Sequence, residues 1–299
     1  MSAASGEILF WNRRARRVEA EKVYGEAWLK RGYANPLGRF ITKTLLTSRA
    51  FSQVYGAFQD SGLSGRKVQP FIQDFKIDMG EYEEREFPTF NEFFIRQFRP
   101  GKRPFVLDPN QMAAPAEARY LAFERILEDQ TFPVKGSFLS AAGLLADSDL
   151  AKPFIGGPLL LARLCPVDYH RYHFPDDGRT LRTWTVHGPY HSVNPVALQA
   201  KPDIFVTNER QISLLETKNF GRLAFIEVGA LCVGKIVQSH DGSKPFQRGD
   251  EKGYFLFGGS TVIVLGEPGA WRPSADLLEQ TKHGRETLVQ LGDEVARKG

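Results

Sequence analysis

The stretch EKGYFLFGGSTVIVL occupies residues 251–265 and contains two apolar runs, rich in aromatic and β-branched residues, on either side of Gly258-Gly259. Apolar runs of this kind, bounded by glycine, are typical of β-strands. A Gly-Gly pair between two strands indicates a β-bulge or a tight turn. The stretch therefore predicts two strands that meet at Gly258, Gly259 and Ser260.

The same texture begins at about residue 112, where short apolar runs alternate with glycine and proline. It predicts a β-rich, mostly antiparallel domain over residues 106–299, which ends in a mainly helical segment from Ser274. The expected strands cover residues 120–123, 158–163, 183–186, 211–215, 223–228, 254–257 and 261–265.

Residues 1–105 differ in character and are predicted to form a basic, helical region that associates with membranes. Between residues 37 and 58 apolar side chains recur at helical spacing, with basic residues on the opposite side. Both packing on the body of the protein and lying in a membrane interface fit this pattern. A short Phe-rich helix is expected within residues 87–104, with Thr89 as its N-cap. The two regions together predict an α+β fold.

The distribution of charge favours an anionic partner. The net charge is +4, yet residues 1–70 contain 12 Lys and Arg residues against 5 Asp and Glu residues. No zinc-finger or RNA-recognition motif accompanies this basic segment, so anionic lipid is favoured over nucleic acid. No apolar run reaches the ~20 residues of a transmembrane helix, and Cys165 and Cys232 make no disulfide framework. We therefore expect a peripheral protein at the cytoplasmic face of the cell membrane.

The Gly259–Ser260 peptide is a candidate site of self-cleavage. Glycine leaves its carbonyl carbon unhindered, so Ser260 Oγ can attack it in an N-to-O acyl shift. The ester would then break by β-elimination, and the dehydroalanine would hydrolyse to a pyruvoyl group and ammonia. A serine hydroxyl needs a base for such a step. For an isolated Gly-Gly-Ser match, a structural bulge would be the better interpretation.

A candidate base lies in residues 163–175, which read RLCPVDYHRYHFP. His170 and His173 are three residues apart, and histidine suits proton transfer near neutral pH. One histidine can deprotonate Ser260, and the other can move protons during turnover. No further cluster of Cys and His lies nearby in the sequence, so a zinc site is not expected.

Other segments are weaker candidates when taken singly. Glu117, just before an expected strand, can orient a histidine as the acid of a catalytic triad does. The loops at 190–195 and 208–210, together with the small residues of 227–236, can bring main-chain amides close to a ligand or to the cleavage site.

In their order along the chain, these segments resemble the phosphatidylserine decarboxylase family. The resemblance covers nearly the whole chain, and its specificity comes from eight ordered blocks that end in the self-cleavage tetrapeptide. The blocks are FNEFFIRQFRPGKRP (90–104), PAEA (115–118), KGSFLSAAGLL (135–145), RLCPVDYHRYHFP (163–175), SVNPVAL (192–198), NER (208–210), VGALCVGKI (228–236) and EKGYFLFGGSTVIVL (251–265).

The resemblance implies a proenzyme that cleaves itself between Gly259 and Ser260 into a β chain, 1–259, and an α chain, 260–299. Ser260 would become a covalent pyruvoyl cofactor. The family uses neither pyridoxal phosphate nor a metal, so neither is expected here.

Motif position also implies roles for three side chains. His173 matches the family's base for self-cleavage, and His170 is expected near the substrate carboxylate. Glu117 matches the acidic residue of the family's PADG block, which reads PAEA in this sequence. Glu keeps the charge but is one methylene longer than Asp, and a placement error of about 1 Å can cost about 10²-fold in rate.

The expected reaction is decarboxylation of phosphatidylserine to phosphatidylethanolamine and CO₂. The expected partners are phosphatidylserine, an anionic membrane surface, the β and α chains of one proenzyme and a second copy in a homodimer, without nucleic acid. Two alternatives stay open. One is a pyruvoyl-dependent decarboxylase of a free amino acid, and the other is an unprocessed, non-catalytic lipid-binding homologue, which the Glu117 substitution motivates.

Overall fold

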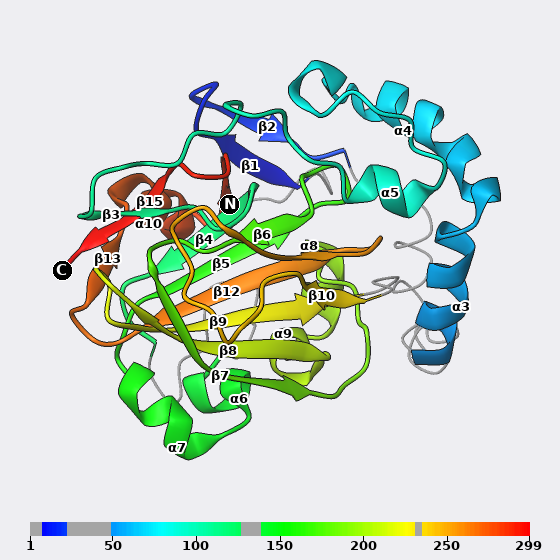
Figure 1. Ribbon diagram of the computed structural model, residues 1–299. Helices are drawn as coiled ribbons and strands as arrows, with labels where there is room; N and C mark the ends of the chain where they lie inside the picture. The colour runs from blue at the N-terminus through cyan, green and yellow to red at the C-terminus, as the bar shows by residue number, and fades with distance from the viewer. Residues whose placement is uncertain (1–7, 23–48, 127–138, 231–234) are drawn as a thin grey trace.

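The computed structural model describes residues 8–22, 49–126, 139–230 and 235–299. Its centre is a nine-stranded sheet (Figure 1). In spatial order the strands are β2 (Arg17–Ala20), β1 (Leu9–Asn12), β14 (Glu286–Val289), β4 (Ala118–Phe123), β5 (Leu159–Leu164), β12 (Ser260–Gly266), β9 (Arg222–Gly229), β8 (Arg210–Thr217) and β7 (Gly178–Val186). Strand β1 pairs in parallel with β14, and the other neighbours pair antiparallel.

A three-stranded sheet packs on one face of the large sheet. Its strands are β10 (Ile236–Gln238), β11 (Glu251–Phe255) and β6 (Arg171–His173). The ring of Tyr172 on β6 packs on Phe225 of β9, with centroids 6.2 Å apart, and Lys252 Nζ of β11 lies 2.6 Å from Glu227 Oε1 of β9. A second small sheet contains β13 (Trp271–Pro273), β15 (Glu294–Lys298) and β3 (Gln111–Ala113).

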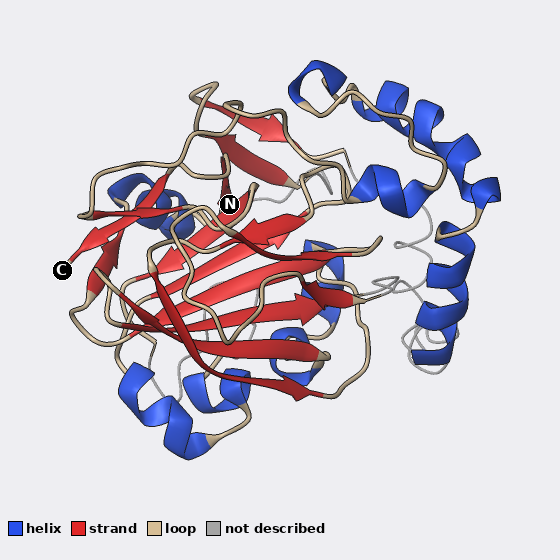
Figure 2. Ribbon diagram, in the orientation of Figure 1, coloured by secondary structure: helices blue, strands red, loops and turns tan. Residues whose placement is uncertain are grey.

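Three helices, α3 (Arg49–Gln59), α4 (Val68–Phe75) and α5 (Phe90–Phe94), lie together beside the large sheet (Figure 2). Aromatic side chains join them: the ring of Phe71 on α4 meets that of Phe90 on α5 at 5.3 Å, and Tyr55 on α3 packs against the same cluster. The other helices are α6 (Ala141–Leu145), α7 (Ser148–Ala151), α8 (Pro195–Ala200), α9 (Ile204–Thr207) and α10 (Ala275–Lys282), with 3₁₀ turns η2 (Gly62–Lys67), η3 (Met79–Glu81) and η4 (Lys152–Phe154).

The structure confirms the α+β fold and the expected strands, which correspond to β4, β5, β7, β8, β9, β11 and β12. The Phe-rich helix is α5, and Thr89 caps it by accepting a hydrogen bond from the Glu92 N–H at 3.1 Å. The helix expected from Ser274 is α10, but the residues that follow it are not helical. After α10 the chain returns to the sheets as β14 and β15, because Thr287 and Val289 are buried and β4 supplies partners for their main chain.

The N-terminal region contains strands that the sequence analysis assigned to helix. Residues 9–12 and 17–20 form the hairpin β1–β2, which extends the large sheet through β14. Of the helix expected over residues 37–58, the part from residue 49 onward lies in α3, and residues 37–48 lie outside the described residues. No helix in the described ranges is long and apolar enough to cross a membrane.

Candidate active site

Ser260 is the first residue of β12, near the middle of the large sheet. It pairs with Leu164 of β5 on one side and with Gly229 of β9 on the other. Its side chain is fully buried, with 0% exposed. Two residues earlier, Gly258 has a φ of +147°, which L side chains rarely adopt. Glycine is therefore required where the chain turns into β12.

The Ser260 side chain faces the small sheet of β10, β11 and β6. Paired residues on antiparallel strands point to the same side, and so does every second residue along one strand. Through its pairing with β9, Ser260 shares a side with Glu227 and Phe225. Those two residues contact Lys252 and Tyr172 of the small sheet. Within the described ranges Ser260 Oγ has no hydrogen-bond partner, so the hydroxyl is uncommitted.

His170 extends the β6–β11 ladder by one residue and lies beside the main chain of Gly258. Its ring stacks on Phe94, with centroids 3.8 Å apart. Nδ1 lies 3.0 Å from the main-chain oxygen of Asp168, and because a carbonyl only accepts, Nδ1 carries the proton. Nε2 therefore has the lone pair, and it has no hydrogen-bond partner among the residues described. Burial lowers the pKa of His170 to about 3, so the ring is neutral.

His173 points to the opposite side of β6 from His170, because residues three apart on a strand lie on opposite faces. Its Nδ1 donates to the main-chain oxygen of Gly249 at 2.9 Å. Nε2 then accepts from the Tyr169 hydroxyl at 3.2 Å. Burial also lowers the pKa of His173. The structure thus brings His170, and not His173, to the side of β6 that faces Ser260.

Glu117 is held by an arginine. Arg103 binds it through Nε, 2.5 Å from Oε2, and through Nη2, 3.0 Å from Oε1, while the Leu291 N–H donates to Oε2 at 3.3 Å. Arg103 also binds Glu81, with 2.8 Å between Nη2 and Oε2. Burial raises the pKa of Glu117, and Arg103 opposes that shift. Because both ring nitrogens of His173 have other partners, Glu117 does not orient that ring directly here.

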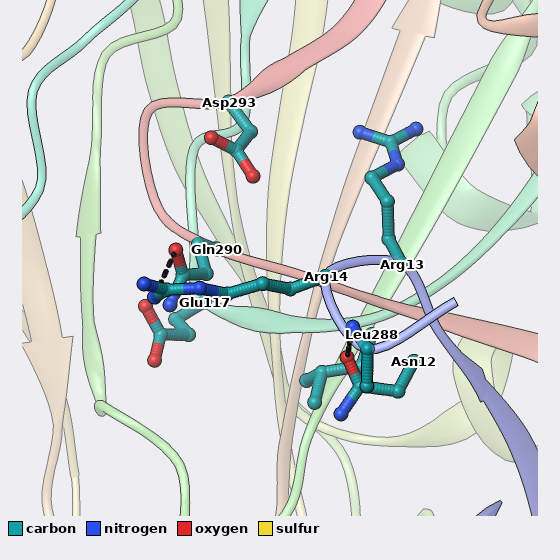
Figure 3. Close-up of a pocket in the computed structure, with 8 residues that line it drawn as sticks. Asn12, Arg13, Arg14, Glu117, Leu288, Gln290 and Asp293 are labelled. Atoms are coloured by element: carbon teal, nitrogen blue, oxygen red, sulfur yellow. Dashed lines mark hydrogen bonds between the residues drawn. The ribbon is translucent and has the colours of Figure 1, made fainter. Parts of the chain in front are cut away.

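A polar cavity of about 230 Å³ opens beside Glu117 (Figure 3). The turn between β1 and β2 contributes Arg14, and the segment after β14 contributes Gln290 and Asp293. Arg14 Nη1 donates to Gln290 Oε1 at 3.3 Å. Ser260 does not line this cavity, so the cavity is distinct from the Gly259–Ser260 peptide.

Two apolar side chains, Val193 and Ala230, lie next to Gly259. A Cβ placed on Gly259 would lie 3.4 Å from Val193 Cγ2 and 3.9 Å from Ala230 Cβ. The segments that begin at residues 190 and 227 therefore meet at the Gly259–Ser260 peptide, although residues 231–234 lie outside the described part of the chain.

Two residues of this site, Asp168 and Tyr169, were not among the residues expected from the sequence. The main-chain oxygen of Asp168 fixes the tautomer of His170, and its carboxylate binds Arg119 at 2.5 Å. The Tyr169 hydroxyl donates a hydrogen bond to Nε2 of His173. Both residues lie in the sequence block 163–175, directly before His170. Their position next to the two histidines could have indicated that they belong to the site.

The amino-acid sequence of this chain matches a known protein family. The sequence model of the family described as phosphatidylserine decarboxylase matches residues 90–297. The chain belongs to the phosphatidylserine decarboxylase family. The matched range includes Glu117, His170, His173 and Ser260.

Curated relatives of this family cover almost the whole chain. A phosphatidylserine decarboxylase proenzyme of Clostridium botulinum, strain Hall, is 40% identical over 293 residues, which is 97% of this chain and 99% of the relative. Proenzymes of the same name from Clostridium perfringens, strain SM101, and Clostridium novyi, strain NT, are 39% and 40% identical over 97% of this chain and 100% and 99% of their own lengths. The similarity therefore includes the N-terminal residues that precede the family match.

Proposed function

We propose that this chain is a phosphatidylserine decarboxylase proenzyme that cleaves itself between Gly259 and Ser260 and converts Ser260 into a pyruvoyl group. The observation that carries the proposal is the buried hydroxyl of Ser260 at the start of a central strand, which has no hydrogen-bond partner among the described residues. The family membership and the proenzyme relatives support it. Intact mass of the purified protein tests it, because two chains and the loss of one ammonia are expected.

Self-cleavage would take place between the adjacent residues Gly259 and Ser260. Ser260 Oγ attacks the Gly259 carbonyl carbon, and the peptide nitrogen leaves as the amine of residue 260. Removal of the Cα proton of residue 260 then expels the Gly259 carboxylate and leaves a dehydroalanine, which water converts to pyruvoyl and ammonia. We assign the first proton to His173, as the family resemblance implies. Because His173 points away from Ser260 on β6, its ring must leave the Tyr169 hydroxyl and also reorient toward Ser260 before Nε2 can accept that proton.

The residues around Ser260 fit a pyruvoyl group. The group is smaller than the serine from which it forms, and the Val193 and Ala230 side chains already line the approach to Gly259. A pyruvoyl carbonyl acts as the electron sink when CO₂ leaves an amino acid. We assign the proton exchange during turnover to His170 Nε2, which has a lone pair on the side of β6 that faces Ser260.

We further propose that the surface formed by α3 and η2 meets the anionic membrane. Val54 is 73% exposed and Leu63 is 63% exposed, although both are apolar. Lys67 extends over the ring of Phe58, with Nζ 4.4 Å from the centroid. Apolar side chains next to basic ones are typical of segments that lie in a membrane interface. The homodimer and the cytoplasmic face of the membrane stay predictions.

The double variant Val54→Ser/Leu63→Ser should bind vesicles that contain phosphatidylserine at least about 10-fold more weakly, because each apolar side chain contributes ~1.5–3 kcal/mol when buried. Flotation of the full chain with vesicles measures this. Leu107→Ser is the matched control, since Leu107 is 92% exposed but lies outside α3 and η2. Equal vesicle binding by the double variant and the control would contradict the proposal that α3 and η2 form the membrane surface.

A further inference from the structure

Asn91 on α5 holds the main chain just before the cleavage peptide. Its Oδ1 accepts a hydrogen bond from the Phe257 N–H at 2.9 Å, and its Nδ2 donates to Asp60 Oδ1 at 2.7 Å. Asn91 is buried, with 3% exposed. Because an N–H only donates and a carboxylate only accepts, the two partners fix the orientation of the amide.

The side chain of Phe257 is held by the same helix. Its ring meets Phe90 and Phe94 in edge contacts, each with centroids 5.0 Å apart. Phe94 in turn stacks on His170 at 3.8 Å. Helix α5 therefore contacts both the segment between β11 and Gly259 and the ring of the neighbouring histidine.

Only Gly258 separates this anchor from Gly259, whose carbonyl carbon Ser260 would attack. Gly258 has a φ of +147° and no side chain to restrict it. The hydrogen bond from Phe257 to Asn91 therefore fixes the main chain two residues before Gly259. Asp60, which directly follows α3, fixes Asn91 from the other side.

We propose that Asn91 is a positioning residue that sets the Gly259–Ser260 peptide for attack by Ser260 Oγ. The inference rests on the proposed self-cleavage. Without the side-chain oxygen of Asn91, the buried Phe257 N–H would lose its partner, and the chain would shift to find another. A displacement of about 1 Å at a reacting group can cost about 10²-fold in rate.

The test follows the disappearance of the full-length chain after a pulse of cell-free synthesis. Asn91→Ala should cleave about 10²-fold more slowly than the unchanged chain. Asn91→Asp keeps an oxygen for Phe257 but sets a second carboxylate against Asp60, so it should also be slow. The double variant Asp60→Asn/Asn91→Asp exchanges donor and acceptor between the two side chains and should recover most of the rate.

Two measurements separate positioning from a general loss of structure. Asn110→Asp is a matched control, because Asn110 Nδ2 also lies near an aspartate, 3.2 Å from Asp108 Oδ1, on the surface; it should cleave normally. In a Ser260→Ala background, hydrogen exchange at the Phe257 amide should be fast with Asn91→Ala and slow with the double variant.

The inference fails if Asn91→Ala cleaves at the rate of the unchanged chain. It also fails if the double variant is no faster than Asn91→Asp although its thermal unfolding matches that of the control. If the unchanged chain itself stays intact, the proposed self-cleavage fails instead, so the two failures can be told apart.

Discussion

Ser260→Ala is expected to leave one chain of 33.6 kDa on a denaturing gel, whereas the unchanged protein should separate into chains 1–259 and 260–299. Alanine has no oxygen to attack the Gly259 carbonyl, so the acyl shift cannot begin. The effect should be complete, because Ser260 Oγ is itself the nucleophile. Ser260 Oγ has no hydrogen-bond partner among the described residues, so the substitution removes no hydrogen bond within them.

Ser213→Ala is the matched control for this prediction. Ser213 is also buried in the large sheet, at 1% exposed, and its hydroxyl bonds to Thr183 at 3.2 Å. The control should cleave normally. The mass of the small chain should be lower by one ammonia than that of a chain that begins with serine. An intact unchanged protein, or a Ser260→Ala chain that still cleaves, would contradict the pyruvoyl proposal and favour the non-catalytic alternative.

The two histidines should separate the two chemical steps. His173→Ala is expected to remain uncut, because it removes the base assigned to Ser260. His170→Ala is expected to cleave but to decarboxylate phosphatidylserine at least about 10²-fold more slowly, which is the usual contribution of general acid–base catalysis. A gel measures the first effect, and release of CO₂ from carboxyl-labelled phosphatidylserine measures the second.

The geometry of the two histidines also defines the result that would contradict these assignments. In the structure it is His170 that faces the same side as Ser260, while His173 accepts from Tyr169 on the other side of β6. If His170→Ala stays uncut and His173→Ala cleaves, the two roles are reversed. Tyr169→Phe serves as the control, because it frees Nε2 of His173 and should cleave at least as fast as the unchanged chain.

Much of the fold was predictable because its signals are local. The runs that flank Gly258 and Gly259 contain their own strand pattern, so β11 and β12 could be expected without any knowledge of their neighbours. The hairpin β1–β2 could not. Its place depends on the parallel pairing of Phe10 with Glu286, which no short window of sequence contains.

The residues of the site could be predicted from the sequence, but the contacts between their side chains could be predicted less well. Ser260 and the histidine pair followed from motif chemistry. The side to which each histidine points depends on where β6 begins, since a spacing of three on a strand separates two side chains. The partner of Glu117 was not visible either, because Arg103 lies 14 residues earlier and outside any helix or strand, where no regular spacing relates the two side chains.

The position of the Gly259–Ser260 peptide has a consequence for the life of the mature enzyme. Strand β12 would belong to the small chain, yet it is paired along its length between β5 and β9 of the large one. The two chains of the cleaved protein should therefore be detected as one complex in native mass spectrometry. The sheet would fold while β12 is still covalently joined to the rest of the chain. Cleavage would then break that covalent connection. Once denatured, the mature enzyme should not regain activity, and neither chain should exchange between molecules.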